Sequence, residues 1–148
     1  APVGVYLDAG INVALGTDSA ASNNRLDLFA EMRLASLLAK VTQDDASALP
    51  APTVLRMATL GGARALGLDG RIGSLVPGKD ADAIAVDLAG VGLVPCYAPV
   101  SHLVHAAGRE HVTDVWIEGE RLVVRGAPVR LDPAAIAARA ALWRDRIA

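Results

Sequence analysis

The stretch Val13-Ala14-Leu15-Gly16-Thr17-Asp18 is an uninterrupted apolar run that ends in a carboxylate. Such a run is typical of a strand that is buried on both faces of a parallel sheet. Parallel α/β enzymes, and barrels above all, place their chemistry at the carboxyl ends of strands. The pattern therefore predicts a strand over residues 11–17, with Asp18 at the edge of the sheet where a site would form.

A carboxylate buried at that edge needs a partner, since an unpaired buried charge is costly. The residues that follow Asp18 are small and polar, and the next basic residue along the chain is Arg25. A metal ion or several hydrogen-bond donors would satisfy the carboxylate as well as a cation would. A helix-capping aspartate at the junction of strand and loop is the alternative interpretation. Position alone leaves both interpretations open.

Composition argues against several classes of protein. The chain has 148 residues and a net charge of −2, with no basic stripe to favour nucleic acid or an anionic membrane as a partner. It is long enough for one domain but too short for a complete (β/α)8 barrel of about 250 residues. No stretch approaches the roughly 20 apolar residues of a membrane span. The lone Cys96 is interpreted as a packing residue that fits a reducing compartment, so we expect a cytoplasmic protein.

The chain opens on a helical pattern, with Pro2 suited to a first turn and Gly10 suited to a helix end. A helix over residues 2–9 followed by a buried strand is half of a βα unit that lacks its preceding strand. We therefore expect the chain to be a segment of a longer protein, with further residues upstream of Ala1.

Two more helices are predicted over residues 26–41 and 52–66. Asn24 is placed to act as the N-cap of the first. Gly61 and Gly62 weaken the second helix relative to alanine, so we expect a neighbouring element to approach closely there.

From residue 68 onward, turns and short extended runs replace the helical pattern. Strands are predicted over 82–87, 112–117 and 122–124, and Glu118-Gly119 joins the last two as a hairpin of open turn type. Residues 101–108 are compatible with a short helix. Asp132-Pro133 begins a closing helix that runs to residue 147.

Two motifs carry a resemblance to a known family. They are the Gly-Thr-Asp-x-x-x-Ser-Asn-Asn run over residues 16–24 and the Gly-Lys-x-Ala-Asp run over residues 78–82. With the segments 26–35, 58–67, 99–104 and 112–119, they resemble the amidohydrolase superfamily. Within it, the match is to the branch of 5-methylthioadenosine/S-adenosylhomocysteine deaminases and triazine chlorohydrolases.

The resemblance implies an α/β fold, the C-terminal part of a metal-dependent (β/α)8 barrel plus part of a small β-sandwich, or composite, domain. Residues 1–67 would hold the last strand and helices of the barrel. Residues 68–132 would belong to the small β composite domain, and residues 133–148 would form the C-terminal helix. The open edge of the β part would be completed by strands from upstream.

The resemblance also implies chemistry at Asp18. Family members bind a divalent metal at the barrel mouth, and here zinc is favoured over iron or manganese. The aspartate that ends the last strand is a metal ligand and also accepts the proton of the metal-bound water, whose pKa falls to about 7. Asp18 matches this aspartate, so it is the predicted catalytic and metal-binding residue.

The other metal ligands of the family have no counterpart in the chain. No His-x-His occurs, and the three histidines, His102, His105 and His111, all lie in the second half. A local metal site on His102 and His105 is conceivable, but packing roles are favoured. The remaining site residues would lie upstream of Ala1, so the isolated chain is expected to be inactive.

The loop after Asp18 holds Ser19, Ser22, Asn23 and Asn24, whose residue types favour turns and caps for local reasons. Ser19 is a weak candidate for substrate binding. The others could hydrogen-bond to Asp18 and so orient its carboxylate without binding the metal themselves. Two further pairs are interpreted as structural. They are Glu31 and Arg33 as ion-pairing or helix-packing residues, and Trp116 and Trp143 as core or interface anchors.

Three functions remain open. The first is a metal-dependent aminohydrolase that deaminates 5′-methylthioadenosine or S-adenosylhomocysteine and releases ammonia. The second is the same machinery acting on another ring, as a triazine chlorohydrolase or a guanine or pterin deaminase. The third is a non-catalytic assembly module. The expected partners are a small-molecule substrate, the upstream segment and further copies in a homodimer or higher homo-oligomer.

Overall fold

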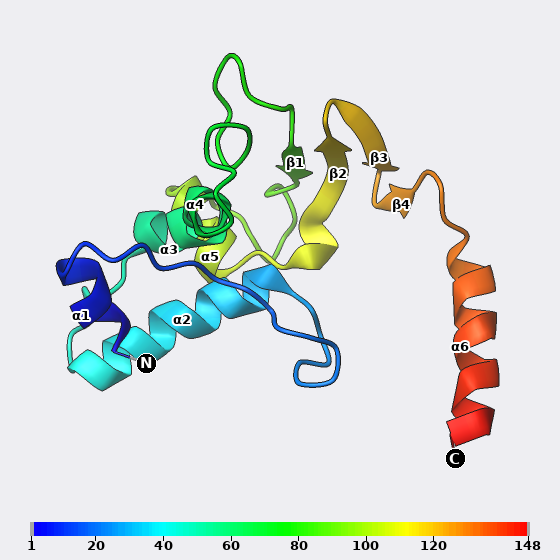
Figure 1. Ribbon diagram of the computed structural model, residues 1–148, viewed down its shortest axis with the longest axis horizontal. Coiled ribbons are helices and arrows are strands. Elements are labelled where there is room, and N and C mark those ends of the chain that lie inside the picture. The colour runs from blue at the N-terminus through cyan, green and yellow to red at the C-terminus, as the bar shows by residue number, and fades with distance from the viewer. Residues whose placement is uncertain (1, 148) are drawn as a thin grey trace.

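The computed structural model describes residues 2–147, except for the side chain of residue 145. A group of helices fills one side of the structure and a small antiparallel sheet the other (Figure 1). The helices of this group are α1 (Val3–Asp8), α2 (Leu28–Gln43), α3 (Ala51–Ala58), α4 (Leu60–Ala65) and α5 (Pro99–His105). The closing helix α6 (Pro133–Ile147) stands apart from both, and its described side chains are exposed (Figure 1).

The sheet has four strands in the order β1-β2-β3-β4, and every pair is antiparallel. Its strands are β1 (Ala83–Val86), β2 (Val112–Ile117), β3 (Glu120–Val124) and β4 (Ala127–Pro128), and the short 3-10 helix η1 (Arg109–His111) leads into β2. Glu118 and Gly119 both have positive φ, 50° and 79°, which makes the predicted hairpin turn type I′. Among the described strands β1 pairs only with β2, so one edge of the sheet is open, as expected.

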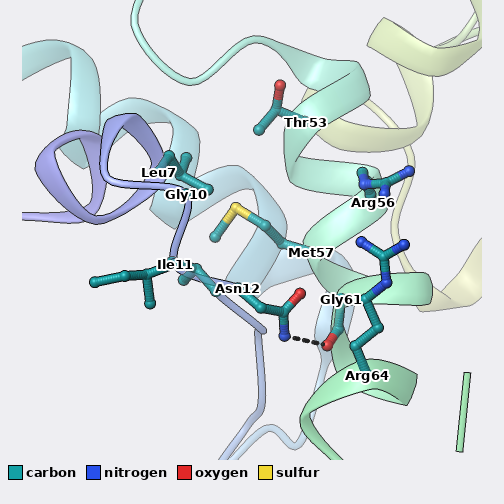
Figure 2. Close-up of a pocket in the computed structure, with 10 residues that line it drawn as sticks. Leu7, Gly10, Ile11, Asn12, Thr53, Arg56, Met57, Gly61 and Arg64 are labelled. Carbon is teal, nitrogen blue, oxygen red and sulfur yellow. Dashed lines mark hydrogen bonds between the residues drawn. The ribbon is translucent and has the colours of Figure 1, made fainter.

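Residues 11–17 form no strand, which corrects the expectation from the apolar run. A strand exists only where a neighbouring strand completes its ladder of hydrogen bonds, and among the described residues 11–17 have no such neighbour. The segment is instead held by helices. The backbone N–H of Leu15 donates to the carbonyl of Met57 at 3.2 Å, and the Asn12 side chain donates to the carbonyl of Gly61 at 3.0 Å (Figure 2).

The second predicted helix is divided at Thr59, where φ is −121° and ψ is −95°. The division lets α4 begin anew and brings Gly61 against the 11–17 segment. A Cβ atom at Gly61 would lie only 2.8 Å from the Val13 carbonyl oxygen. The close approach predicted for the glycine pair is therefore confirmed at Gly61.

Asp27, and not Asn24, is the N-cap of α2. Its Oδ1 accepts the backbone N–H groups of Phe29 at 3.1 Å and Ala30 at 3.3 Å. Both Asn and Asp suit this position, but α2 begins at Leu28, two residues later than predicted, and only Asp27 is adjacent to its first turn.

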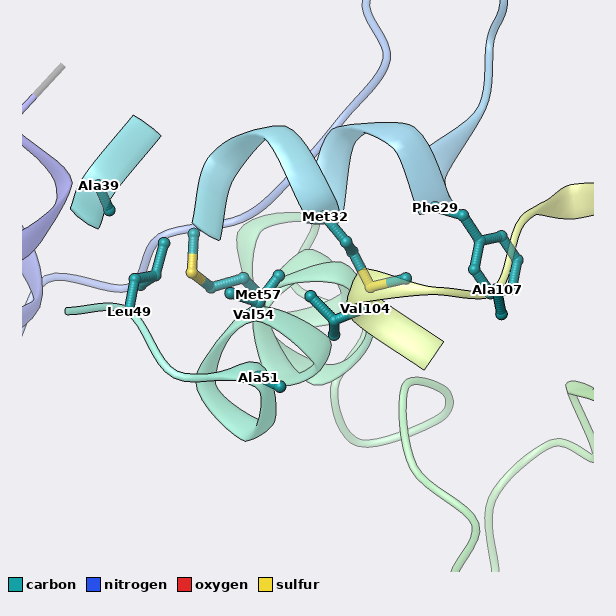
Figure 3. Packing of buried hydrophobic residues seen from close by; sticks show 9 residues of the cluster. All are labelled: Phe29, Met32, Ala39, Leu49, Ala51, Val54, Met57, Val104 and Ala107. Atoms are coloured by element: carbon teal, nitrogen blue, oxygen red, sulfur yellow. The ribbon is translucent and has the colours of Figure 1, made fainter. Parts of the chain in front are cut away.

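The hydrophobic core lies between α2, α3 and α5 (Figure 3). Val54 of α3 and Val104 of α5 are fully buried, and Ser36 of α2 is buried with its hydroxyl donating to the Leu49 carbonyl at 3.1 Å. The other members of the core are Phe29, Met32, Ala39, Leu49, Ala51, Met57 and Ala107. The division of the chain at residue 67 stays a prediction, but α5 packs into this helical core although it follows that boundary.

Candidate functional site

Asp18 directly follows the 11–17 segment, and it begins the loop that leads to the N-terminal end of α2. Figure 1 shows this loop beside that end of the helix. Its backbone is left-handed, with φ of 58°, a conformation that aspartate adopts more readily than most residues. The side chain is exposed, and the burial expected for it is not found in this chain. Residues 11–17 are themselves half-buried or exposed, so the described residues do not enclose the segment that leads to Asp18.

Two hydrogen bonds within the loop act on the Asp18 carboxylate. The Ser22 hydroxyl donates to Oδ2 of Asp18 at 2.7 Å. This bond, together with one from the backbone of Ser19, holds the pKa of Asp18 below its ordinary value. Hydrogen bonds to the charged form favour that form, so Asp18 is an ionised carboxylate at neutral pH.

The loop after Asp18 closes on itself and is tied to α2. The carbonyl of Ser19 accepts the backbone N–H groups of Ser22 at 3.1 Å and Asn23 at 2.8 Å. The side-chain amide of Asn23 then donates to Oε1 of Glu31, in the first turn of α2, at 2.7 Å. The turn role expected for these residues is therefore present.

The structure brings together some predicted residues and not others. Ser22 contacts the Asp18 carboxylate directly, whereas the Ser19 hydroxyl is exposed and lies 3.4 Å from that of Ser22. Glu31 joins the same network through Asn23. The spacing of Asp18 and Ser22, four residues apart across a turn, was the available signal for this contact.

Arg25 does not pair with Asp18. Its guanidinium lies 3.2 Å from Oδ2 of Asp27, so it supports the cap of α2. Arg33 donates to the carbonyl of Ala107 at 2.8 Å and so joins α2 to the residues after α5. Arg33 therefore has the predicted helix-packing role. Its partner is a backbone carbonyl and not the carboxylate of an ion pair.

The histidines engage their own surroundings. Nδ1 of His102 lies 3.2 Å from the carbonyl of Ala98, and Nδ1 of His111 accepts the backbone N–H of Gly108 at 3.0 Å. Burial, with Lys40 and Arg33 nearby, lowers the pKa of His105. These contacts favour packing roles for the histidines.

The two tryptophans each pair with an arginine. Arg121 lies over the ring of Trp116 at 5.4 Å, and Arg146 lies over the ring of Trp143 at 5.2 Å. Trp116 is half-buried in the sheet, whereas Trp143 is 55% exposed on α6. Neither ring belongs to the core cluster between the helices.

The cavity in Figure 2 lies at the beginning of the 11–17 segment, at the other end from Asp18. Its lining includes Asn12, Arg56, Met57, Gly61 and Arg64. It therefore lies apart from the candidate site at Asp18.

A metal ion would find one fitting ligand in this loop. Asp18 offers an exposed, ionised carboxylate, which is a good donor for zinc and other divalent ions. Across residues 2–147, leaving out the side chain of residue 145, however, no group of three or more His, Cys, Asp or Glu side chains is placed to hold a metal. Asp18 thus fits a metal site that takes its other ligands from elsewhere. Across the same residues, no helix has the length and apolar character to cross a membrane.

Relatives with curated names match nearly the whole chain. A 5-methylthioadenosine/S-adenosylhomocysteine deaminase from Teredinibacter turnerae is 46% identical over 99% of this chain and 33% of its own length. Another from Syntrophobacter fumaroxidans is 56% identical over 84% of this chain and 28% of its own length. The chain thus spans about a third of the length of these relatives.

Solved structures give the same result. An adenosine deaminase from Xanthomonas campestris with bound zinc has a TM-score of 0.96 and 51% identity, covering 99% of this chain and 33% of that one. An atrazine chlorohydrolase from Arthrobacter aurescens, complexed with zinc, has a TM-score of 0.87 and 35% identity. The match covers 94% of this chain and 31% of that one. These neighbours confirm the expected fold class, and the matching amidohydrolase family covers residues 1–122. The chain belongs to the amidohydrolase family.

Proposed function

We propose that this chain is a segment of a metal-dependent aminohydrolase that deaminates 5′-methylthioadenosine or S-adenosylhomocysteine and releases ammonia. The observation that carries the proposal is the exposed Asp18 carboxylate, held by Ser22 in a chain whose curated relatives are named as such deaminases. Hydrolysis of this kind replaces a C–N bond by a C–O bond, with water as the co-reactant.

The role proposed for Asp18 has two parts. One carboxylate oxygen would help to hold a divalent metal, and the other would take a proton from water and pass it to the leaving amine. A bound divalent metal supplies the Lewis acidity that lowers the pKa of water. Zinc is favoured, because it is bound in the neighbouring structures, and iron or manganese would serve the same role.

The environment of Asp18 suits proton transfer. In this segment the carboxylate is open to water, and the hydrogen bond from Ser22 keeps it in the ionised form, which is the form that can accept a proton. Ser19 is a further proposal, as a residue that contacts substrate, since its exposed hydroxyl lies beside Asp18. Ser19→Ala should then raise KM and leave kcat near its original value.

The remaining metal ligands and the residues that choose the ring are proposed to lie in other parts of the same protein. We also propose a cytoplasmic homo-oligomer. The lone Cys96 supports a reducing compartment, and the exposed apolar side chains of α6, Trp143 among them, support burial against a further subunit.

The direct test is an assay of the longer protein loaded with zinc, manganese or iron. Ammonia release from 5′-methylthioadenosine or S-adenosylhomocysteine is the expected result, and the inosine-type product can be followed optically. The isolated 148-residue chain is the matched control and should be inactive.

A second candidate, a triazine chlorohydrolase, is favoured by the structural match to the enzyme from Arthrobacter aurescens. Atrazine and guanine therefore belong in the same assay. Chloride release from atrazine with no activity on either nucleoside would assign the protein to this second class. Absence of turnover on every substrate by the metal-loaded longer protein would favour an assembly module.

A further inference from the structure

Among the described residues, the loop that carries Asp18 has little burial, and hydrogen bonds hold its conformation. Asp18, Ser19 and Ser22 are all exposed, and the backbone at Asp18 is in the left-handed region with φ of 58°. A non-glycine residue holds this conformation at some energetic cost, so the surrounding contacts must maintain it.

Asn23 is the residue through which the loop is anchored. It is half-buried and bonded on both sides of its amide. Its Oδ1 accepts the backbone N–H of Arg25 at 3.1 Å, and its Nδ2 donates to Oε1 of Glu31 at 2.7 Å. Its backbone N–H also closes the turn onto the Ser19 carbonyl at 2.8 Å.

Glu31, the acceptor in this contact, belongs to a well-packed part of α2. It lies in the first turn of α2, between Phe29 and Met32, which are both buried in the core. The cap at Asp27 fixes the same turn. A contact to Glu31 therefore ties the exposed loop to a part of the molecule that packing holds still.

We propose that Glu31 and Asn23 are positioning residues for Asp18. The hydrogen bond between them fixes the 18–23 loop on α2, and Ser22, which immediately precedes Asn23, directs the Asp18 carboxylate. The function of this arrangement, which rests on the proposed metal role of Asp18, is to present the carboxylate to the metal in one orientation. Groups that orient a metal ligand from behind typically affect metal affinity by 10- to 100-fold.

The test measures zinc affinity of the longer protein by competition with a chelator, together with kcat and the thermal midpoint. Glu31→Ala and Asn23→Ala remove the same bond from its two ends, and each should weaken zinc binding about 10-fold. Glu31→Gln should stay within about 2-fold of the original affinity, because its amide oxygen accepts the same bond. Thr42→Ala is the matched control, since it removes one hydrogen bond at the far end of α2.

The pattern of results separates positioning from general stability. Loss of zinc affinity in both alanine variants, with rescue by Glu31→Gln and no loss in Thr42→Ala, supports the proposal. Unchanged affinity in Glu31→Ala or in Asn23→Ala overturns it. If either alanine variant fails to fold, the other decides the result.

Asp18→Asn distinguishes this proposal from the proposed function. Weakened zinc binding in Asp18→Asn with normal binding in the two alanine variants overturns the positioning role alone. Unchanged zinc binding in Asp18→Asn would remove the metal role of Asp18 and the positioning proposal with it.

Discussion

The side-chain amide of Asn12 donates to the carbonyl oxygen of Gly61 across 3.0 Å and joins residues 49 positions apart in the chain. This contact brings α4 so close to the 11–17 segment that a Cβ atom at Gly61 would lie 2.8 Å from the carbonyl oxygen of Val13 and 3.0 Å from that of Arg56. Both obstacles are backbone atoms, which cannot move aside as a flexible side chain would.

Gly61→Ala should therefore destabilise the protein by about 1–3 kcal/mol, the usual range for overpacking. Gly62→Ala is the matched control, because the nearest atom to its Cβ would lie at an ordinary 3.9 Å. It should be neutral or stabilising by up to about 1 kcal/mol, since alanine favours helix over glycine. Thermal unfolding of both variants provides the measurement, and equal midpoints would contradict the close packing.

Asp27→Ala should destabilise α2 by about 1 kcal/mol, because the cap satisfies two backbone N–H groups of the first turn. Asp27→Asn should keep most of this stability, since asparagine caps equally well. It loses only the ion pair with Arg25, whose side chain is 64% exposed and whose contribution is correspondingly small. Denaturant unfolding would show the difference, and equal losses in the two variants would assign the effect to the ion pair.

The pKa of Asp114 lies below its ordinary value of 3.8, chiefly because Arg121 donates hydrogen bonds to its carboxylate. A carboxyl with a lowered pKa in the folded state contributes stability at pH values above its ordinary pKa. That contribution is lost as the pH falls through the folded-state pKa. We therefore expect the thermal midpoint of the protein to decrease as the pH is lowered below about 4. Asp114→Asn should make this decrease smaller.

Arg121→Gln should also make the thermal midpoint less sensitive to pH below about 4, because it removes the guanidinium that binds the Asp114 carboxylate. The double variant should then be little worse than Arg121→Gln alone, which removes the same interaction and also the contact with the Trp116 ring. Additive losses would show that the two residues stabilise the sheet independently.

Asp18→Asn should abolish turnover in the longer enzyme while preserving the fold, because the amide cannot accept a proton from water. Losses of general acid–base groups are typically 10²-fold or more. Without bound metal, the thermal midpoint should change little, because the Asn amide oxygen can still accept the hydrogen bond from Ser22. A variant that retained more than about a tenth of the original rate would remove Asp18 from the proton-transfer role.

Local signals in the sequence predicted most of the elements correctly. The hairpin at Glu118-Gly119 and the helix start at Asp132 depend on turn and cap chemistry within a few residues. The N-cap of α2 was assigned wrongly because Asn24 and Asp27 both suit a cap, and only the path of the chain decides between them. The break at Thr59 precedes a contact between Gly61 and the distant 11–17 segment, and periodicity cannot report such a contact.

The sequence was enough to predict which residue forms the candidate site, but not what surrounds that residue. The resemblance pointed to Asp18, which stays a prediction as a metal ligand. Its exposure and its bond to Ser22 depend on how the loop closes in space. The contact of Asn23 with Glu31 likewise joins a loop to a helix eight residues further on, and no residue pattern specified it.

The place of α5 in the core has a consequence for how the protein unfolds. The chain leaves the helical core after α4, forms β1, and returns at Pro99 to place Val104 between α2 and α3 before it completes the sheet. A chain that ended at residue 67 would lack the fully buried Val104 and the buried Ala107. The helices and the sheet should therefore melt in a single cooperative transition, and neither half should persist as a stable proteolytic fragment.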